Sequence, residues 1–296
     1  MFKALFQPKS NQPREENLSG VLRVVGDRAA GKTTYMAAIA RWPNANAESP
    51  VQTVTPYNKD SEDLVTKARN ILEQGMELEP TRIVNDVAEI KDYTLRIAFK
   101  EQFSGNNSTR VTLDVSCKDY AGEFFSDLLH QAASPLLGDY LDDCLQATGI
   151  LLLIDGTAYK KDAQYEMGVD KLLIALDKDI QKNRRRIALV LNKCEQPELW
   201  VNRTKPRFLA EARFEKVYNK LESWQKSGSG SVDYFTASAL GILGNRYPKP
   251  NSKQIKRDRG GITSVLAEPD KWRPFGLVAP LYWLCTGKRS KELDKD

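Results

Sequence analysis

The sequence predicts an α/β fold in which a mostly parallel sheet is covered by helices on both faces. Three observations predict this fold. An apolar run at residues 21–25 leads through a glycine-bounded loop into an Ala-rich helical stretch that ends before Pro43. Further apolar runs at 149–155 and 187–191 are each followed by helical periodicity, as in parallel βαβ units. Residues 92–117 alternate apolar and polar side chains around a turn, which predicts one antiparallel hairpin.

Local signals predict the other elements of the first half. Residues 1–17 are polar and contain two prolines, so we expect a flexible N-terminal arm. Residues 43–60 are rich in Pro, Asn, Ser and Thr, which is typical of a loop. Ser61 can cap a helix over 61–74, whose apolar residues recur on one face. The hairpin strands are expected at 92–99 and 110–117, on either side of a Ser-Gly-Asn-Asn turn.

The second half alternates helices with strands. We expect helices over 124–147, 164–182 and 207–225, a short strand over 232–236 and a final helix that ends near residue 286. Residues 241–270 are basic and rich in Gly and Pro, so we expect irregular structure there. The last ten residues, 287–296, are expected to form a solvated, charged C-terminal tail.

The bulk composition disfavours several classes of protein. The 296 residues carry 44 basic and 39 acidic side chains, and this net charge of +5 does not favour a nucleic-acid partner. No apolar run is long enough to cross a bilayer, and because the N-terminus has no long apolar segment we expect no secretory signal. The four cysteines form no C-x-x-C pair, which indicates thiols in a reducing compartment. We therefore expect a cytoplasmic protein without a transmembrane segment.

Residues 26–33 fit the pattern G-x-x-x-x-G-K-[ST] between the first strand and the first helix. The two glycines let the backbone curl so that its N–H groups face an anion, and the helix N-terminus adds partial positive charge. Lys32 can reach the β- and γ-phosphates, and the Thr33 hydroxyl can ligate Mg²⁺. The pattern predicts a nucleoside triphosphate site formed by Gly26, Asp27, Arg28, Ala29, Ala30, Gly31, Lys32, Thr33 and Thr34.

Three later segments complete a set of motifs in a fixed order. Residues 119–122 (DYAG) fit D-x-x-G, residues 192–195 (NKCE) are similar to N-K-x-D, and residues 236–240 read TASAL. With the phosphate loop, they resemble the motifs of the Ras-like small GTPases of the TRAFAC, or translation-factor-related, class of P-loop NTPases. The layout is also similar to that of bacterial double-GTPases. The resemblance implies a three-layer G domain over 18–286, with insertions at 43–80 before the first switch and 241–274 before the last helix.

The resemblance implies GTP or GDP with Mg²⁺ as ligands. In such proteins the Asp of D-x-x-G, here Asp119, holds Mg²⁺ through water, and the N–H of Gly122 contacts the γ-phosphate. A threonine of the first switch also ligates Mg²⁺ and senses the γ-phosphate. We expect this residue to be Thr81, which precedes the hairpin, with Thr53 and Thr55 as alternatives.

The base would be held by residues 192–195 and 236–240. By resemblance, Asn192 ties its segment to the phosphate loop, Lys193 lies over the base, and the backbone of Ser238 and Ala239 binds the guanine keto oxygen. A carboxylate at Glu195 can accept both the ring N–H and the amine of guanine, which adenine does not match. Because Glu is one methylene longer than the usual Asp, selectivity for guanine over adenine stays open.

Two departures from the family pattern affect catalysis, to which we assign Lys32, Glu123 and Arg28. Glu123 follows Gly122 where many relatives carry a Gln that orients the attacking water, and a carboxylate there is repelled by the γ-phosphate. Arg28 could supply positive charge to the transition state, block an incoming arginine finger, or face solvent. Asp155 also ends an apolar strand, but the D-x-x-G pattern makes Asp119 the better Mg²⁺ candidate.

These motifs predict a GTP-binding molecular switch with slow Mg²⁺-dependent hydrolysis, that is, a GTPase of weak intrinsic activity that signals to an effector or regulatory protein. The alternative is a nucleotide-binding scaffold without significant turnover, which Glu123 and Arg28 motivate. A P-loop ATPase or kinase fits the phosphate loop but leaves residues 192–195 and 236–240 unexplained. The partner, the pathway and the oligomeric state stay open.

Overall fold

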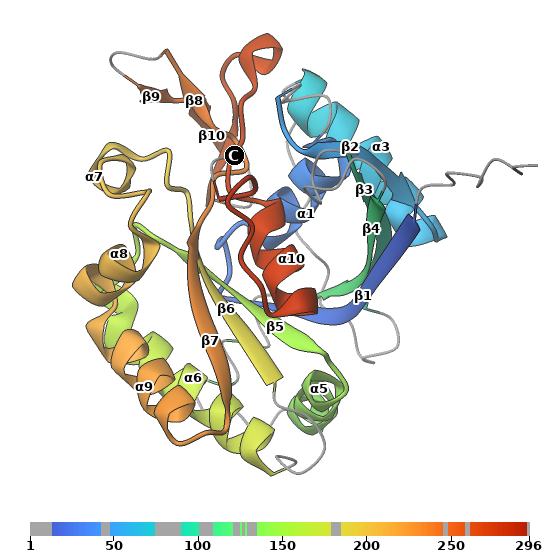
Figure 1. Cartoon of the computed structure of the whole chain (residues 1–296). Coiled ribbons are helices and arrows are strands. Elements are labelled where there is room, and N and C mark those ends of the chain that lie inside the picture. The colour runs from blue at the N-terminus through green and yellow to red at the C-terminus, as the bar shows by residue number, and fades with distance from the viewer. Residues whose placement is uncertain are drawn as a thin grey trace, which may run out of the picture.

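The computed structural model describes residues 14–42, 48–74, 90–100, 109–120, 125, 128, 135–178, 185–244, 248–257 and 261–294. Its centre is a seven-stranded sheet with the order β2-β3-β4-β1-β5-β6-β7 (Figure 1). In chain order these strands are β1 Arg14–Val25, β2 Val51–Pro56, β3 Asp92–Phe99, β4 Thr109–Asp119, β5 Gly149–Asp155, β6 Arg185–Asn192 and β7 Gly230–Thr236.

Six of the seven strands point in the same direction, and five of these are paired in parallel. Strand β1 pairs in parallel with β4 and β5, and β5, β6 and β7 continue the parallel series. Strands β2 and β3 pair antiparallel, as do β3 and β4. The predicted fold class, an α/β fold with a mostly parallel sheet and one antiparallel hairpin, is confirmed. The parallel strands all end at one edge, where the loops that follow them meet.

Helices cover both faces of the sheet. They are α1 Lys32–Ala40, α3 Lys59–Gln74, α5 Pro135–Leu145, α6 Asp162–Asp177, α7 Pro197–Trp200, α8 Pro206–Arg213, α9 Glu215–Lys226 and α10 Val278–Thr286, with the short 3-10 helices η3 Tyr159–Lys161 and η4 Pro269–Lys271. Figure 1 shows α1, α3 and α10 on one side and α5, α6, α8 and α9 on the other.

Side chains on the two faces of the sheet pack into two separate hydrophobic cores, as β5 illustrates. In β5, Leu151 and Leu153 belong to the core that also contains residues of α1, α3 and α10. Ile150, Leu152 and Ile154 belong to the core that also contains residues of α5, α6 and α9. All five side chains are buried. A strand buried on both faces is therefore apolar at every position, which is why the run at 149–155 was visible in the sequence.

Several predicted elements are correct within a few residues. Strand β5 has the predicted bounds, β3 and β4 form the predicted hairpin, and α3 begins two residues before the predicted start. The helix of 207–225 is instead two helices, α8 and α9, separated at Phe214, whose buried ring marks the break.

Three segments differ from the prediction because tertiary pairing overrides local composition. Strand β1 begins at Arg14, inside the expected arm, since residues 14–24 pair with β4. The expected loop of 43–60 contains the edge strand β2, which pairs with β3. The expected irregular stretch contains two antiparallel hairpins, formed by β8 Ile242–Leu243 with β9 Lys249–Pro250 and by β10 Ser252–Arg257 with β11 Gly261–Leu266.

The described part of the C-terminal tail, residues 287–294, is largely exposed, but two of its side chains attach it to the rest of the protein. Arg289 forms ion pairs with Asp233 of β7 and with Asp294, both at 2.8 Å, and its guanidinium lies 4.1 Å from the centre of the Phe235 ring. Leu293 is buried in the first core. The tail is thus charged and mostly exposed, and Arg289 and Leu293 attach it to β7 and to the first core. No helix among the described residues combines the length and apolarity that a membrane span needs.

Candidate functional site

The predicted phosphate loop joins the end of β1 to the start of α1. Its two glycines are required by packing and by backbone conformation. A Cβ at Gly26 would collide with the carbonyl oxygen of Leu153 in β5. Gly31 caps α1 with φ of 90°, and Ala29 also has a positive φ, of 62°. Such left-handed residues turn successive backbone N–H groups toward a shared concavity that suits an anion.

Lys32 lies across this loop. Its Nζ donates hydrogen bonds to the carbonyl oxygens of Gly26, at 2.8 Å, and Asp27, at 3.0 Å. The side chain is buried although it is charged. The ammonium group is thus held over the loop backbone, where it can meet a phosphate without a large rearrangement. Arg28 and Ala29, in contrast, are exposed.

The two predicted Mg²⁺ residues of the described chain are in contact. The Thr33 hydroxyl donates to Oδ2 of Asp119 at 2.7 Å, although the residues are 86 positions apart. Asp119 ends β4 in register with Val24 of β1, which places it beside the phosphate loop. Its side chain is only 1% exposed, and Oδ1 has no hydrogen-bond partner among the described residues.

Burial raises the pKa of Asp119, while the Thr33 hydrogen bond and the charges of Lys32 and Lys67 act in the opposite direction. A buried carboxylate oxygen without a partner and an adjacent hydroxyl are ligands suited to Mg²⁺, which takes the rest of its octahedral shell from phosphate and water. The described residues contain no group of three or more His, Cys, Asp or Glu side chains that could hold a metal by itself. The residues present therefore fit a Mg²⁺ ion that arrives with a nucleotide.

Asp155, the competing acid, is fully engaged by the protein. Its Oδ2 accepts from Lys193 Nζ at 2.6 Å, and its Oδ1 accepts from the backbone N–H and hydroxyl of Thr157 at 2.9 and 2.7 Å. Lys193 has a positive φ of 62°. The resemblance implied that Lys193 covers a base, whereas here its ammonium group pairs with Asp155.

The segments at 192–195 and 236–240 meet at the phosphate loop. Asn192 Nδ2 donates to the carbonyl oxygen of Ala30 at 2.8 Å, as the resemblance implied. A Cβ at Gly31 would lie 2.7 Å from the same amide nitrogen, so the glycine also leaves room for this contact. The backbone N–H of Cys194 donates to the carbonyl oxygen of Ala237 at 3.0 Å. One hydrogen-bonded unit therefore links the loop to both predicted base-binding segments.

Glu195 is buried in this unit, with 4% of its surface exposed. Its Oε2 has no hydrogen-bond partner among the described residues, and Oε1 lies 3.5 Å from the Gln196 amide nitrogen. Burial raises the pKa of Glu195, opposed by hydrogen bonding with Ser238 and by the charge of Lys193. A buried carboxylate oxygen without a partner costs free energy unless a ligand donates a hydrogen bond to it. Two adjacent N–H groups of a base would supply such donors.

Aromatic residues that the motif search did not single out support the 236–240 segment. The backbone of Ser238 forms a two-way bridge with Phe275, both bonds at 3.0 Å. Trp272 Nε1 donates to the carbonyl oxygen of Ala239 at 2.7 Å, and Trp200 packs edge-on against Phe275. The Trp and Phe of the sequence WRPF at 272–275 were the available signal.

Three predicted residues, Thr81, Gly122 and Glu123, lie outside the described residues. The alternatives for the switch threonine are placed by strand register. Thr55 of β2 lies opposite Arg96 of β3, which lies opposite Asp114 of β4. Asp114 in turn lies opposite Ser19 of β1. Ser19 is six residues before the end of β1, roughly 20 Å along the strand from the loop. Thr53 lies still farther away, so neither alternative threonine reaches the phosphate loop in this structure.

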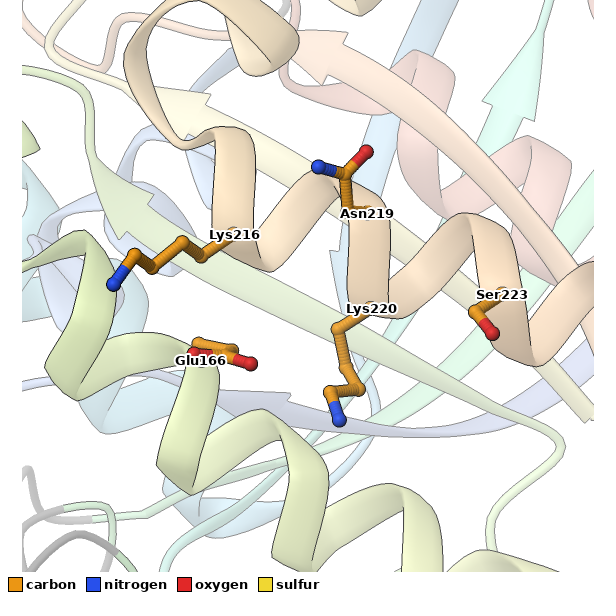
Figure 2. A pocket seen from close by; sticks show the side chains of 5 residues that line it. All are labelled: Glu166, Lys216, Asn219, Lys220 and Ser223. Atoms are coloured by element: carbon orange, nitrogen blue, oxygen red, sulfur yellow. The ribbon is translucent and has the colours of Figure 1, made fainter.

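A separate polar pocket of about 450 Å³ lies between α6 and α9, and none of its residues belongs to the strand-end site (Figure 2). Lys216 and Lys220 extend from α9 toward α6, which carries Glu166. Lys220 forms an ion pair with Asp170 of α6 at 2.9 Å. The pocket is a groove between two surface helices and lacks the buried unpartnered groups of the strand-end site.

Comparison with known proteins gives structural neighbours only. No protein-family model matches the chain, and no curated protein matches it. A chain of the signal recognition particle receptor SRb-GTP/SRX complex from Chaetomium thermophilum is similar with a TM-score of 0.45 and 15% identity, over 77% of this chain and 92% of that one.

The GTPase-like domain of Ski7 from S. cerevisiae is also similar, and its two structures were solved with GTP and with GDP and inorganic phosphate. The TM-scores are 0.38 and 0.37 and the identities 15% and 16%, over 81% of this chain and 48% of each of those chains. Since all three TM-scores are below 0.5, the fold assignment depends on the strand order and on the contacts at the strand ends.

Proposed function

We propose that this protein is a guanine-nucleotide-binding switch that binds GTP or GDP with Mg²⁺ at the carboxyl edge of its sheet and hydrolyses GTP slowly. The observation that carries the proposal is a pair of buried carboxylates, Asp119 and Glu195, which flank the phosphate loop. Each has an oxygen without a partner among the described residues. In this proposal Asp119 serves the metal–phosphate group and Glu195 serves the base.

At the phosphate end, the N–H groups of residues 26–34 and the Lys32 ammonium would bind the phosphate oxygens. The Thr33 hydroxyl would ligate Mg²⁺, and Asp119 would hold the ion through a water molecule. Mg²⁺ supplies charge neutralisation to the β- and γ-phosphates when it is bound. The 2.7 Å contact between Thr33 and Asp119 supports this assignment because it brings both groups to one point.

At the base end, Glu195 would accept the ring N–H and the amine of guanine, and the backbone of Ser238 or Ala239 would donate to the keto oxygen. Asn192 would fix the distance between the base and phosphate sites, and its bond to Ala30 supports this role. The burial of Glu195 supports the assignment, since a carboxylate in a low-dielectric site gains more from charge-assisted hydrogen bonds than one in water.

Nucleotide binding by calorimetry tests the proposal. Wild type is expected to bind GTP and GDP with Mg²⁺ more tightly than ATP, and Glu195→Ala is expected to lose that preference. Glu198→Ala is the matched control because Glu198 is an exposed acid three residues away. Equal affinity of wild type for GTP and ATP would replace the guanine assignment with that of a P-loop ATPase. No binding of any nucleotide would refute the proposal.

Turnover and signalling form the second part of the proposal. Thr81 and Gly122 would order around the γ-phosphate and present a surface to a partner protein in the cytoplasm. Glu123 and Arg28 favour the alternative of a scaffold that binds GTP without hydrolysing it, because a carboxylate beside the γ-phosphate opposes attack. Single-turnover release of phosphate above the protein-free background separates the two. Equal affinity of the partner for the GTP-bound and GDP-bound forms would refute the proposed switch function.

A further inference from the structure

The phosphate loop contains an acid where a polyanion is expected to bind. Asp27 is the second residue of the loop, directly after Gly26. A carboxylate close to phosphate oxygens repels them, and the repulsion is larger at a partly buried position than in water. The Asp27 side chain is only 12% exposed, so solvent screens it poorly. A loop built in this way needs a compensating charge before it can hold a nucleotide well.

The structure supplies that charge from a distant element. Lys161, the last residue of η3, places its Nζ 2.6 Å from Oδ2 of Asp27, and the Tyr165 hydroxyl of α6 donates to the same oxygen at 3.1 Å. Oδ1 accepts from the backbone N–H of Arg28 at 2.6 Å. Both oxygens of Asp27 are therefore engaged, and the contacts from η3 and α6 span more than 130 residues of sequence.

The segment that carries Lys161 is anchored independently of the loop. Asp162, the next residue, accepts the backbone N–H groups of Lys216 and Val217, at 3.0 and 3.2 Å, and so caps the N-terminus of α9. The Tyr165 ring is buried and packs against Phe125 and Phe214, with ring centres 5.8 and 6.1 Å away. The residues on either side of Lys161 are thus held by contacts that do not involve the loop.

We propose that Lys161 is a positioning residue of the nucleotide site: it neutralises Asp27 and holds this carboxylate against η3 and α6, so that the loop can accept phosphate. The inference depends on the proposed function, since it assumes that a nucleotide binds there. Lys161 itself is 49% exposed, and such a pair adds little to folding stability. Its effect is therefore expected in ligand affinity rather than in the stability of the free protein.

The test compares the Lys161→Ala, Asp27→Asn and double variants of the full chain. Calorimetry with Mg²⁺·GTP and with Mg²⁺·tripolyphosphate measures affinity, and thermal unfolding without ligand checks the fold. Lys161→Ala is expected to weaken both ligands about tenfold, because it leaves the Asp27 charge uncompensated. Asp27→Asn in the Lys161→Ala background is expected to restore most of the loss. Tyr165→Phe, which keeps the ring but removes one hydrogen bond, is expected to weaken binding about twofold to threefold.

Lys160→Ala is the matched control, since it removes the same charge one residue away. The Lys160 side chain is exposed, and no contact between it and the loop is seen in the described structure. If Lys161→Ala and Lys160→Ala bind alike, or if Asp27→Asn does not rescue Lys161→Ala, the inference is wrong while the proposed function stands. Because tripolyphosphate lacks a base, it tests the inference even if the guanine assignment fails. A wild type that binds neither ligand would overturn the inference together with the proposed function.

Discussion

Asp119 and Asp155 end the two strands that flank β1, but their carboxylates have opposite environments. Asp119, at the end of β4, is buried, contacts Thr33 and has one oxygen without a partner among the described residues. Asp155, at the end of β5, has both oxygens engaged by Lys193 and Thr157. Native proteins satisfy most buried polar groups, so an exception points to a ligand. The described residues supply hydrogen-bond partners to both oxygens of Asp155 but to only one oxygen of Asp119.

The same contrast recurs at the two ends of the site. Asp27 lies in the predicted phosphate loop with both oxygens bound by the protein, whereas Glu195, at the proposed base end, has one oxygen without a partner among the described residues. Sequence position alone does not separate these acids, since all four lie at or just after the ends of central strands. Their partners do separate them: two acids are structural and two are available to a ligand.

The largest expected effect tests the first contrast. Asp119→Asn is expected to reduce the Mg²⁺-dependent part of GTP affinity by about tenfold to 100-fold, because it removes the negative charge that, in the proposed site, would hold the ion through water. Asp155→Asn is expected to change it by less than about threefold, since Asp155 already has a cation partner in Lys193. Calorimetry with GTP in Mg²⁺ and in EDTA measures both. A larger effect of Asp155→Asn would reverse the assignment of the two acids.

The next largest effect on nucleotide affinity distinguishes a residue that supports the loop, Asn192, from a residue proposed to bind the base, Glu195. Asn192→Ala removes the 2.8 Å bond to Ala30 and leaves a buried carbonyl without this donor, which costs about 1–3 kcal/mol. Because this bond supports the loop itself, we expect about tenfold weaker binding of GTP and ATP alike. Glu195→Ala should weaken only guanine nucleotides. If Asn192→Ala impaired GTP alone, the bond would serve base recognition rather than loop geometry.

A smaller effect follows from the raised pKa of Glu195. Guanine donors bind the ionised carboxylate, so the bound nucleotide lowers this pKa. GTP affinity is therefore expected to be greatest above the pKa of the free protein and to decrease several-fold as the pH is lowered through it. Calorimetry in buffers of different ionisation enthalpy should detect proton release on binding. ATP binding and the Glu195→Gln variant provide controls. If GTP affinity of that variant had the same pH profile as that of the wild type, Glu195 would not be the source of the pH dependence.

Much of the scaffold could be predicted because its signals are local. The apolar strand β5 and the alternating strands β3 and β4 have the sequence patterns that their burial requires. The phosphate loop was found because its geometry depends on Gly26 and Gly31 at fixed spacing. The resemblance implied that Thr33 and Asp119 serve one metal ion and that Asn192 ties its segment to the loop, and in the structure Thr33 contacts Asp119 and Asn192 contacts Ala30.

The rest depends on contacts between distant segments, which no local pattern encodes. Strand β2 has the composition of a loop and is a strand because β3 offers it an edge. Lys161 was one more basic residue in the sequence, and only the fold brings it to Asp27. Likewise, the pairing of Lys193 with Asp155 was hidden because each belongs to a different strand end.

The smallest expected effect returns to Asp119 and concerns the protein without ligand. Burial raises its pKa in the folded chain above that in the unfolded chain, so the native state binds the proton more tightly. Stability is then greater at low pH, where both states are protonated, and it falls as the pH rises through the window between the two pKa values. Asp119→Asn removes this buried charge.

We therefore expect Asp119→Asn to raise the free energy of unfolding at neutral pH by about 1 kcal/mol, measured by urea denaturation in EDTA without nucleotide. In saturating Mg²⁺·GTP the order of stabilities should reverse, because only the wild type gains the full binding energy. Asp155→Asn should destabilise the free protein instead, since it breaks a satisfied cluster. If Asp119→Asn also destabilised the free protein, its carboxylate would be structural, and the contrast with Asp155 would be lost.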